Sequence, residues 1–310
     1  MKKIILPLIA LLVVSFNACT QDQKKEKGKK KETKTEAVSK SNNSFSTIAE
    51  MPKKLKEISG IVKDGNFFWA ISDNPKSDIY KLDLSGNVVQ QLRLKNTPVT
   101  DVEDVTVDAV YLYIADIGDN NGNRGERQII KIKKSDIGTG EKEDVDGEVI
   151  RFSFPSKGDV QKKKKNENDC EAIISYKGAL YLFTKRRNDK QTELFMLSEK
   201  AGMQVPKSIA LFNSKGLITG ATINSVGNEV ALAGYQNGHK KPFIWLLSAF
   251  IGNNFFSGQQ QNYVLANDEK NWQVESITYK DNAALFFACE ETPDYPATLY
   301  LITKDQLKKH

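Results

Sequence analysis

A short phrase recurs five times along the chain, and it constrains the fold more than any other feature of the sequence. Each copy follows the order polar residue, spacer, polar residue, small residue, aliphatic residue, and two further apolar strand phrases come after it. The copies occupy residues 57–61, 101–105, 169–173, 217–221 and 273–277. A unit made only of strands that repeats at intervals of about 45 to 55 residues is typical of a β-propeller. The sequence therefore predicts an all-β chain in which each copy begins one blade.

The number of blades follows from the fourth strands. Segments suited to a fourth strand come after four of the units, at 88–94, 149–154, 208–212 and 263–265. Too little chain remains after the third strand of the last unit, so we expect residues 44–48, just ahead of the first phrase, to complete that blade. This predicts a five-bladed propeller closed by an N-terminal strand, which also protects two sheet edges. A six-bladed ring is the alternative, because the interval between the second and third phrases is long enough to hide another blade.

The N-terminus carries the pattern of an export signal. Lys2 and Lys3 precede an apolar run over 4–14, and the small residue Ala18 stands directly before Cys19. This pattern resembles a bacterial lipoprotein signal, in which Cys19 becomes the lipidated first residue of the mature chain. A plain secretory signal or a short membrane span is the alternative, although the run is short for a span.

Domain organisation and location follow from that signal. We expect a lipoprotein signal peptide at 1–18, a disordered Lys-rich tether at 19–42 and the β-propeller domain at 43–310. The expected location is the bacterial cell envelope, with the chain anchored through lipidated Cys19 on the periplasmic or surface face of the outer membrane. Residues 1–42 hold ten Lys and four acidic residues, so they carry the whole formal net charge of +6. The propeller is then near neutral, and nucleic acid is not an expected partner.

The remaining cysteines and the closed ring suggest little else about assembly. Cys170 and Cys289 belong to blades that are not neighbours, so we expect two small buried side chains rather than a disulfide, even in an oxidising compartment. A closed ring has no edge that requires a partner, and a monomer is expected.

The geometry of a propeller turns the repeat into a site hypothesis. The first strand of each blade lines the central channel and the second returns antiparallel to it, so the starts of the first strands and the ends of the second strands open on one face. Carboxylates gathered there repel one another unless a cation joins them, and calcium accepts about six to eight oxygen ligands in loose geometry. The candidate calcium ligands are Glu57, Asp101, Glu103, Asp116, Asp169, Glu171 and Glu275. A wet acidic channel balanced by Lys185, Arg186 and Arg124 is the alternative.

The segment 116–124 alternates Asp and Asn with Gly, which suits either a cation-binding loop or an elaborate turn. It lacks the spacing of an EF-hand. The residues that we expect to bind a ligand around the mouth are Asp73, Asp119, Asn120, Arg124, Lys185, Tyr235 and Glu290. Tyr235, Tyr295 and Trp272 are expected to be exposed near the mouth and to offer aromatic contacts.

Several segments resemble known exported propellers. Residues 57–61 and 78–83 look like the opening of the SdiA-regulated family, and 101–104, 113–120 and 180–185 look like a related group of uncharacterised bacterial propeller proteins. The resemblance covers most of the propeller, but its motifs imply fold and channel lining rather than a reaction. Members are similar in architecture to strictosidine synthase-like, paraoxonase-like and phytase-like propellers, where a bound calcium recurs. The positions that the resemblance implies for calcium are Glu103, Glu171 and Glu275.

Two classes of function remain, and the propeller fold hosts both. The chain has only two histidines, His239 and the terminal His310, and it lacks a Gly-x-Ser-x-Gly elbow, a zinc-binding His pair and a Gly-rich phosphate loop. We favour a lipid-anchored binding module, with calcium at its acidic mouth, for an unknown small molecule, glycan or envelope protein. The alternative is a calcium-dependent hydrolase of the phosphoesterase or lactonase type, with a Glu or Asp as base. The sequence identifies no catalytic residue for such an enzyme.

Overall fold

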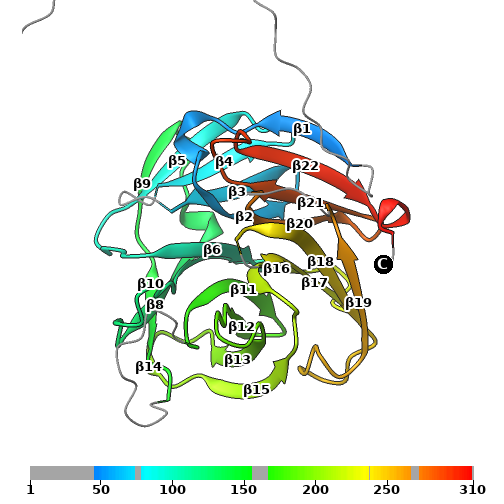
Figure 1. Cartoon of the computed structure of the whole chain (residues 1–310). Helices are drawn as coiled ribbons and strands as arrows, with labels where there is room; N and C mark the ends of the chain where they lie inside the picture. Colours follow the sequence, from blue (N-terminus) through cyan, green and yellow to red (C-terminus); the bar gives the residue numbers. More distant parts are fainter. Residues whose placement is uncertain (1–44, 74–77, 156–166, 237, 267–271, 309–310) are drawn as a thin grey trace, which may run out of the picture. The chain divides into compact units, whose positions relative to one another are not determined.

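Five sheets surround a common centre in the computed structural model of the chain (Figure 1). The structure describes residues 45–73, 78–155, 167–236, 238–266 and 272–308. Each sheet contains four strands that run antiparallel to their neighbours, and two sheets carry a fifth strand. This architecture is a five-bladed β-propeller, as the repeat predicted, and the six-bladed alternative is wrong.

The strands of each blade are ordered from the centre outward as follows. Blade 1 contains β2 (Ile58–Asp64), β3 (Phe67–Ser72), β4 (Ile79–Asp83) and β5 (Val88–Leu94). Blade 2 contains β6 (Val102–Val107), β7 (Tyr111–Asp116), β8 (Arg127–Lys133) and β10 (Glu148–Phe152). Blade 3 contains β11 (Cys170–Tyr176), β12 (Ala179–Thr184), β13 (Thr192–Ser198) and β15 (Lys207–Phe212). Blade 4 contains β16 (Leu217–Ile223), β17 (Glu229–Gln236), β18 (Lys240–Ser248) and β19 (Gln259–Val264).

Blade 5 is closed by the N-terminal strand, as predicted. Its inner strands are β20 (Val274–Asp281), β21 (Ala284–Cys289) and β22 (Thr298–Thr303), and β1 (Ser46–Glu50) completes it. β1 pairs antiparallel with β22, so the first and last strands of the described chain lie side by side. Hydrogen bonding between the two ends of the chain therefore closes the ring, and the outer edge of β22 is covered.

Two short strands that the sequence did not predict extend blades 1 and 2. β9 (Lys142–Val145) pairs parallel with β5, and β14 (Gly202–Gln204) pairs parallel with β10. Both come from connections that belong to the next blade along the chain, so they join neighbouring blades at their outer edges. The remaining regular elements of the described residues are three 3-10 turns, η1 (Lys53–Leu55), η2 (Lys134–Asp136) and η3 (Lys304–Gln306).

The hydrophobic core lies between adjacent blades. Alternate side chains of each middle strand face opposite neighbours, so every blade buries both faces. Phe68 of blade 1 and Phe286 of blade 5 meet edge to face, with ring centroids 5.0 Å apart. Cys170 and Cys289 are buried free thiols, in agreement with the prediction.

The innermost strands β2, β6, β11, β16 and β20 contact one another around the centre. Gly60 makes this close approach possible, because a Cβ there would lie 2.9 Å from both the Cα of Asp104 and the backbone nitrogen of Val105. The predicted signal peptide, the tether and lipidated Cys19 lie outside the described residues. Among the residues that are described, no helix has the length and apolarity needed to cross a bilayer.

Candidate functional site

A β-bulge interrupts the innermost strand of every blade at the same place. The register between the first and second strands skips one residue, and that residue is the second polar position of the repeated phrase. The bulged residues are Ser59, Glu103, Glu171, Thr219 and Glu275. A bulge bends its strand and changes the direction of a side chain. The recurring phrase thus has a direct structural meaning, since it marks a ring of five polar side chains at one end of the channel.

Two members of this ring connect blades. Ser59 Oγ donates a hydrogen bond to the carbonyl oxygen of Val102 at 2.9 Å, and Thr219 Oγ1 donates one to the carbonyl oxygen of Val274 at 2.6 Å. Each bond joins an innermost strand to that of a neighbouring blade. The hydroxyl-bearing positions therefore stabilise the ring itself, whereas the glutamates at the equivalent positions are left to line a pocket.

The pocket at this mouth has a volume of about 350 Å³. Carboxylates outnumber basic groups in its lining, and the few other side chains are polar or aromatic. The lining residues are Glu57, Ser59, Asp73, Glu103, Asn120, Glu171, Lys185, Arg187, Tyr235, His239, Gln273, Glu275 and Glu290. They come from all five blades, which agrees with the prediction that strand starts and strand ends would meet at one mouth.

Lys185 supplies a buried positive charge to the pocket. Its Nζ donates a hydrogen bond to Glu171 Oε2 at 2.9 Å and lies 5.6 Å from the ring centroid of Tyr235. Burial lowers the pKa of Lys185, but Glu171, Tyr235 and Glu275 outweigh that effect, and its pKa is raised well above the usual range. Lys185 therefore remains charged and neutralises part of the acidic ring.

Two carboxylate oxygens in the pocket accept no hydrogen bond from any residue that the structure describes. They are Oε1 of Glu103 and Oε1 of Glu171, on side chains only 6% and 3% exposed. The second oxygen lies 3.7 Å from Arg187 Nη2, which is an ion pair without a hydrogen bond. Burying a carboxylate oxygen without a donor costs free energy. These oxygens are therefore available to a cation or to a donor group of a ligand.

Several carboxyl groups of the site have raised pKa values. Burial is the main cause for Glu103, with Glu171 and Asp101 adding repulsion. Burial, and then the charges of Asp73 and Glu171, raise the pKa of Asp101 to about 6. Burial also raises the pKa of Glu275 well above its usual range, and Glu290 beside it contributes. The mouth therefore favours either proton uptake or the arrival of a positive charge.

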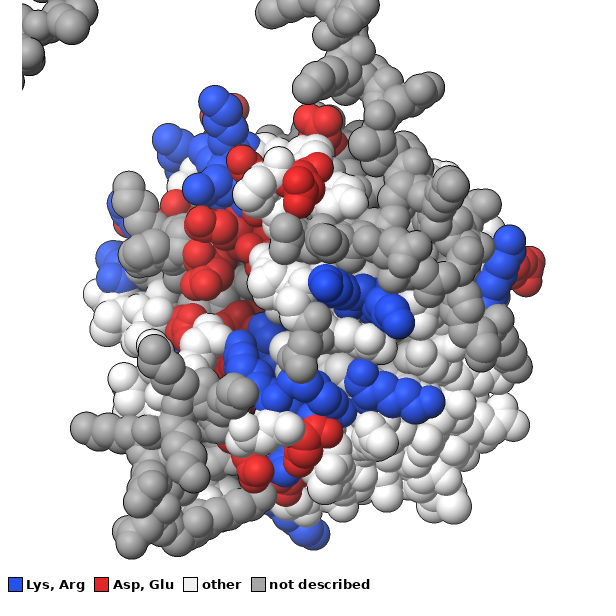
Figure 2. Space-filling model, in the orientation of Figure 1, with Lys and Arg blue, Asp and Glu red and all other residues white. Residues whose placement is uncertain are grey.

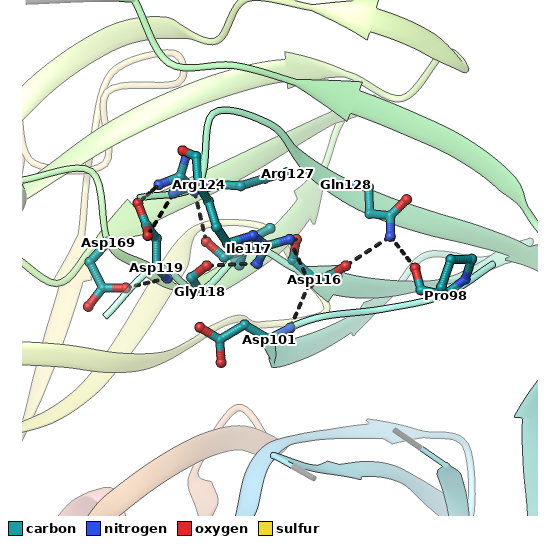
Figure 3. Close-up of polar contacts among 10 residues, drawn as sticks. All are labelled: Pro98, Asp101, Asp116, Ile117, Gly118, Asp119, Arg124, Arg127, Gln128 and Asp169. Atoms are coloured by element: carbon teal, nitrogen blue, oxygen red, sulfur yellow. Dashed lines mark hydrogen bonds and ion pairs between the residues drawn. The ribbon is translucent and has the colours of Figure 1, made fainter. Parts of the chain in front are cut away.

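Three of the predicted acidic residues that lie outside the pocket lining each form an ion pair with an arginine. The pairs are Asp116 with Arg124, Asp119 with Arg127, and Asp169 with Arg187. Figure 3 shows the first two pairs in the loop that follows β7. Arg124 Nη2 lies 2.8 Å from Asp116 Oδ1, and Arg127 Nη2 lies 2.6 Å from Asp119 Oδ2. These three carboxylates are outside the pocket lining.

Hydrogen bonds from the backbone complete this loop. Asp119 Oδ1 accepts hydrogen bonds from the backbone nitrogens of Asn123 and Arg124. The backbone nitrogen of Asp119 donates one to Asp169 Oδ1 at 2.9 Å, which Figure 3 shows. Asp116 also accepts a hydrogen bond from the backbone nitrogen of Asp101. In the structure the Asp- and Asn-rich segment is an elaborate turn that fixes the edge of the mouth, which is one of the two alternatives that its sequence left open.

Most of the other predicted residues reach the pocket. The structure brings together Glu57, Asp73, Glu103, Asn120, Glu171, Lys185, Tyr235, Glu275 and Glu290. Asp101 and Arg124 are not in the lining, although Asp101 lies beside Glu103. Gly118 explains that closeness, because a Cβ there would collide with the carboxylates of both Asp101 and Glu103.

The candidate residues chosen from the sequence left out four residues of the pocket, and the exposure of others was misjudged. The four lining residues that were not among the candidates are Ser59, Arg187, His239 and Gln273. Arg187 follows Lys185 closely in the loop after β12, and that proximity was the available signal. Tyr235 and Trp272 were expected to be exposed, which is wrong, because each is only 3% exposed. Tyr235 lies near the end of β17 and Trp272 lies just before β20, where neighbouring side chains cover them. Tyr295 is half-buried rather than exposed.

The donor chemistry of the mouth suits a hard divalent cation, because carboxylate oxygens are the ligands that calcium prefers and two of them here lack a donor. Glu103, Glu171 and Glu275 are the residues that would hold it. Among the residues described, no group of three or more His, Cys, Asp or Glu side chains is arranged to hold a metal ion.

The fold places this protein among the five-bladed β-propellers. No family model and no curated protein matches its sequence. The chain is similar in structure to the Kuenenia stuttgartiensis hydrazine synthase, with 9% identity and a TM-score of 0.42 over 83% of this chain and 65% of that one. It is also similar to a chain of a mitotic checkpoint complex, with 10% identity and a TM-score of 0.37 over 77% of this chain and 62% of that one.

A third similar structure is a protein of unknown function from Bacteroides thetaiotaomicron VPI-5482. The identity is 11% and the TM-score 0.43, over 84% of this chain and 72% of that one. The present chain spans less than two thirds of the first two chains that it matches.

Proposed function

We propose that this protein is a binding module of the bacterial cell envelope and that the acidic mouth of its propeller is the binding site. The observation that carries the proposal is the bulge ring, which directs Glu103, Glu171 and Glu275 into one pocket. Two buried oxygens of this ring accept no hydrogen bond from the described residues, and Glu103 Oε1 has no ion pair with them either. A stable fold rarely keeps such a group without a partner. A bound cation or ligand supplies that partner.

Calcium is the cation that we propose for this site. Glu103, Glu171 and Glu275 would hold it, and the ion would neutralise carboxylates whose pKa values are raised by burial. When bound, calcium would also offer free coordination positions to an oxygen-bearing ligand in the pocket. Lys185 and Arg187 already pair with Glu171, so the ion would chiefly compensate Glu103 and Glu275.

Anchoring through a lipid on Cys19 is the second part of the proposal. It is supported by the basic residues, the apolar run and the small residue ahead of Cys19, all of which lie outside the described residues. Membership of the SdiA-regulated-like exported propellers belongs to the same proposal and is supported by the segments quoted above. Incorporation of a labelled fatty acid that is abolished by Cys19→Ser would support the anchor, and equal labelling of both chains would contradict it.

The experiment that tests the calcium site is a titration of the full chain, followed by calorimetry and by thermal unfolding. We expect binding and a raised midpoint of unfolding, because a ligand that binds only the folded state stabilises it. The double variant Glu103→Gln, Glu171→Gln should lose both effects. Glu148→Gln on β10, an exposed carboxylate far from the pocket lining, is the matched control. Equal calcium binding by the double variant and the unaltered chain would place the ion elsewhere.

A metal-assisted hydrolase is a second candidate, because His239 lines the same pocket as Glu103 and Glu275. Burial, with Lys185 and Arg187 nearby, lowers the pKa of His239, which keeps the imidazole neutral and able to accept a proton. The test is hydrolysis of phosphoesters and lactones in the presence of calcium. Activity that disappears in both His239→Gln and Glu103→Gln would favour the hydrolase over the binding module.

A further inference from the structure

A cluster of basic residues lies beside the acidic pocket on blades 3 and 4. We call it the basic rim and define it as Arg187, Lys190, Lys215, Lys240 and Lys241. Arg187 and Lys190 are in the loop after β12, Lys215 is in the loop before β16, and Lys240 and Lys241 begin β18. All of these positions are at the same end of their blades as the pocket. Figure 2 shows basic and acidic side chains gathered next to each other on the face seen in Figure 1.

Contacts between the loops make the rim continuous. Ser214 Oγ donates a hydrogen bond to the carbonyl oxygen of Lys190 at 3.1 Å, and Trp245 Nε1 of β18 donates one to the carbonyl oxygen of Ser214 at 2.9 Å. Gly216 packs so closely against Tyr235 and Phe243 that a Cβ would collide with both. The loops of blade 3 are therefore fixed against blade 4, and their lysines belong to one surface.

The backbone of the rim is unusual. Lys190, Lys215 and Lys241 have φ values of 60°, 58° and 49°, and His239 between them and the pocket has a φ of 54°. Residues with a Cβ adopt this left-handed conformation at an energetic cost, and Gly or Asn adopts it more easily. Strained positions of this kind cluster at functional sites. Lys177, at the opposite end of blade 3, has the same conformation with a φ of 48°, so the charge of the rim rather than its backbone distinguishes this surface.

Three lysines of the rim have no ion-pair partner among the described residues, whereas Arg187 pairs with Asp169 and Glu171. Lys215, Lys240 and Lys241 are exposed, and none forms an ion pair with another residue that the structure describes. Lys215 Nζ lies 5.8 Å from the ring centroid of Trp245, which orders the side chain without neutralising it. The propeller as a whole is near neutral, so this local excess of positive charge will attract an anion.

The pocket next to the rim indicates which chemical groups an anionic ligand would carry besides its charge. Glu57, Gln273 and Glu290 are half-buried lining residues, and each offers hydrogen-bonding groups to the pocket. A concave surface of about 350 Å³ with this lining suits one sugar ring rather than a flat membrane or a peptide with apolar anchors. Arg187 and His239 belong to the pocket lining and connect it to the rim.

We propose that the mouth binds an acidic saccharide, with its anionic groups on the basic rim and the hydroxyl groups of one sugar ring in the pocket. This inference rests on the proposed binding function and names the class of its ligand. Carboxylate or sulfate groups accept hydrogen bonds from Lys215, Lys240 and Lys241, and these bonds are strengthened by charge. Sugar hydroxyl groups donate to the half-buried carboxylates of the pocket and accept from Gln273.

The test is calorimetry of the full chain with an oligogalacturonate as the probe, at low and high salt. We expect binding that weakens as salt is added, and no comparable binding of a neutral glucose oligomer of the same length. The variant Lys215→Gln, Lys240→Gln, Lys241→Gln should bind the uronate about tenfold or more weakly. The control is the double variant Lys133→Gln, Lys200→Gln, which should bind the uronate normally. It changes two exposed lysines at the ends of blades 2 and 3 that lie away from the pocket.

Three results would overturn the inference. They are equal binding of the neutral oligomer, unchanged affinity in the rim variant, and no uronate binding at all. Anionic phosphatidylglycerol vesicles are the competing probe, and vesicle binding that depends on the rim without uronate binding would identify a membrane-facing surface instead. Calcium titration of the same chain keeps the two proposals apart, because a chain that binds calcium but not the uronate retains the proposed site and loses only this ligand.

Discussion

Lys185 Nζ donates a hydrogen bond to Glu171 Oε2 over 2.9 Å, and both side chains are almost completely buried at the mouth of the propeller. A buried ion pair adds little net stability, but the loss of one partner leaves the other charge without compensation. Lys185 also faces Glu103 and Glu275, so it balances more than one carboxylate. Lys185 is therefore a central counter-charge of the acidic ring, beside the more exposed Arg187.

We predict that Lys185→Met lowers the free energy of unfolding by about 3 kcal/mol at pH 7, because the buried Glu171 then loses its hydrogen-bonded counter-charge and keeps only the more distant Arg187. Urea unfolding of the variant and of the unaltered chain measures the difference. Lys133→Met, which removes an exposed lysine from the end of β8, is the control and should change stability by less than about 0.5 kcal/mol. Equal effects of the two substitutions would show that Lys185 does not balance the acidic ring.

Asp101 makes the stability of the protein depend on pH. Its pKa is about 6 in the folded chain against a usual value of 3.8. Between these values the folded state binds more protons than the unfolded state, so the free energy of unfolding falls as pH rises through this window. The raised pKa values of Glu103 and Glu275 act in the same direction.

Asp101→Asn removes one of these groups and tests the effect. We expect the variant to lose less stability than the unaltered chain when pH is raised from about 4 to about 6.5. The measurement is urea unfolding at several pH values in the absence of divalent cations. Glu148→Gln should follow the unaltered chain. A variant whose stability falls as steeply as that of the unaltered chain would mean that Asp101 titrates normally.

The sequence predicted the ring of the site because the ring is built by repetition. Each copy of the phrase places one polar residue at a bulge, so a pattern visible along the chain becomes a pattern around the channel. Glu103, Glu171 and Glu275 were found in this way. The same repetition predicted five blades and the closing role of the N-terminal strand.

The partners of long side chains could not be predicted in the same way. The sequence shows that Arg124 and Arg127 follow Asp116 and Asp119 closely, but several pairings satisfy that spacing, and Arg127 was not considered. The outer strands β9 and β14 were missed for a related reason. They are short, polar and paired in parallel with a strand from another part of the chain, so no alternation of apolar residues marks them.

The close packing of the innermost strands leads to a prediction for Gly60. A Cβ at this position would lie 2.9 Å from backbone atoms of the next blade, which cannot move aside as a flexible side chain can. We expect Gly60→Ala to lower the free energy of unfolding by about 1 to 3 kcal/mol, as overpacking does in other cores. Gly125→Ala is the control, because no atom lies within 4 Å of its added Cβ. If thermal unfolding is the same for both variants, β2 and β6 are not packed as closely as described.

The closure of the ring depends on Phe45, which lies directly before β1. Its ring centroid is 5.3 Å from that of Trp272, 5.6 Å from that of Phe287 and 5.2 Å from that of Tyr300. Phe45 is half-buried, so we expect Phe45→Ala to lower the free energy of unfolding by about 2 kcal/mol, which is less than the loss for a fully buried phenylalanine. The loss should be local at first, because β1 is an outermost strand held mainly by its pairing with β22.

Hydrogen exchange of β22 measures that local effect. In Phe45→Ala we expect faster exchange of the β22 amides that face β1, while the amides of blade 3 exchange as in the unaltered chain. Phe67→Ala provides the control, since Phe67 is 37% exposed at the start of β3 and contributes little to the core. Faster exchange in every blade would instead mean that the ring opens as one unit, and that the N-terminal strand is required for the stability of the whole propeller rather than of blade 5 alone.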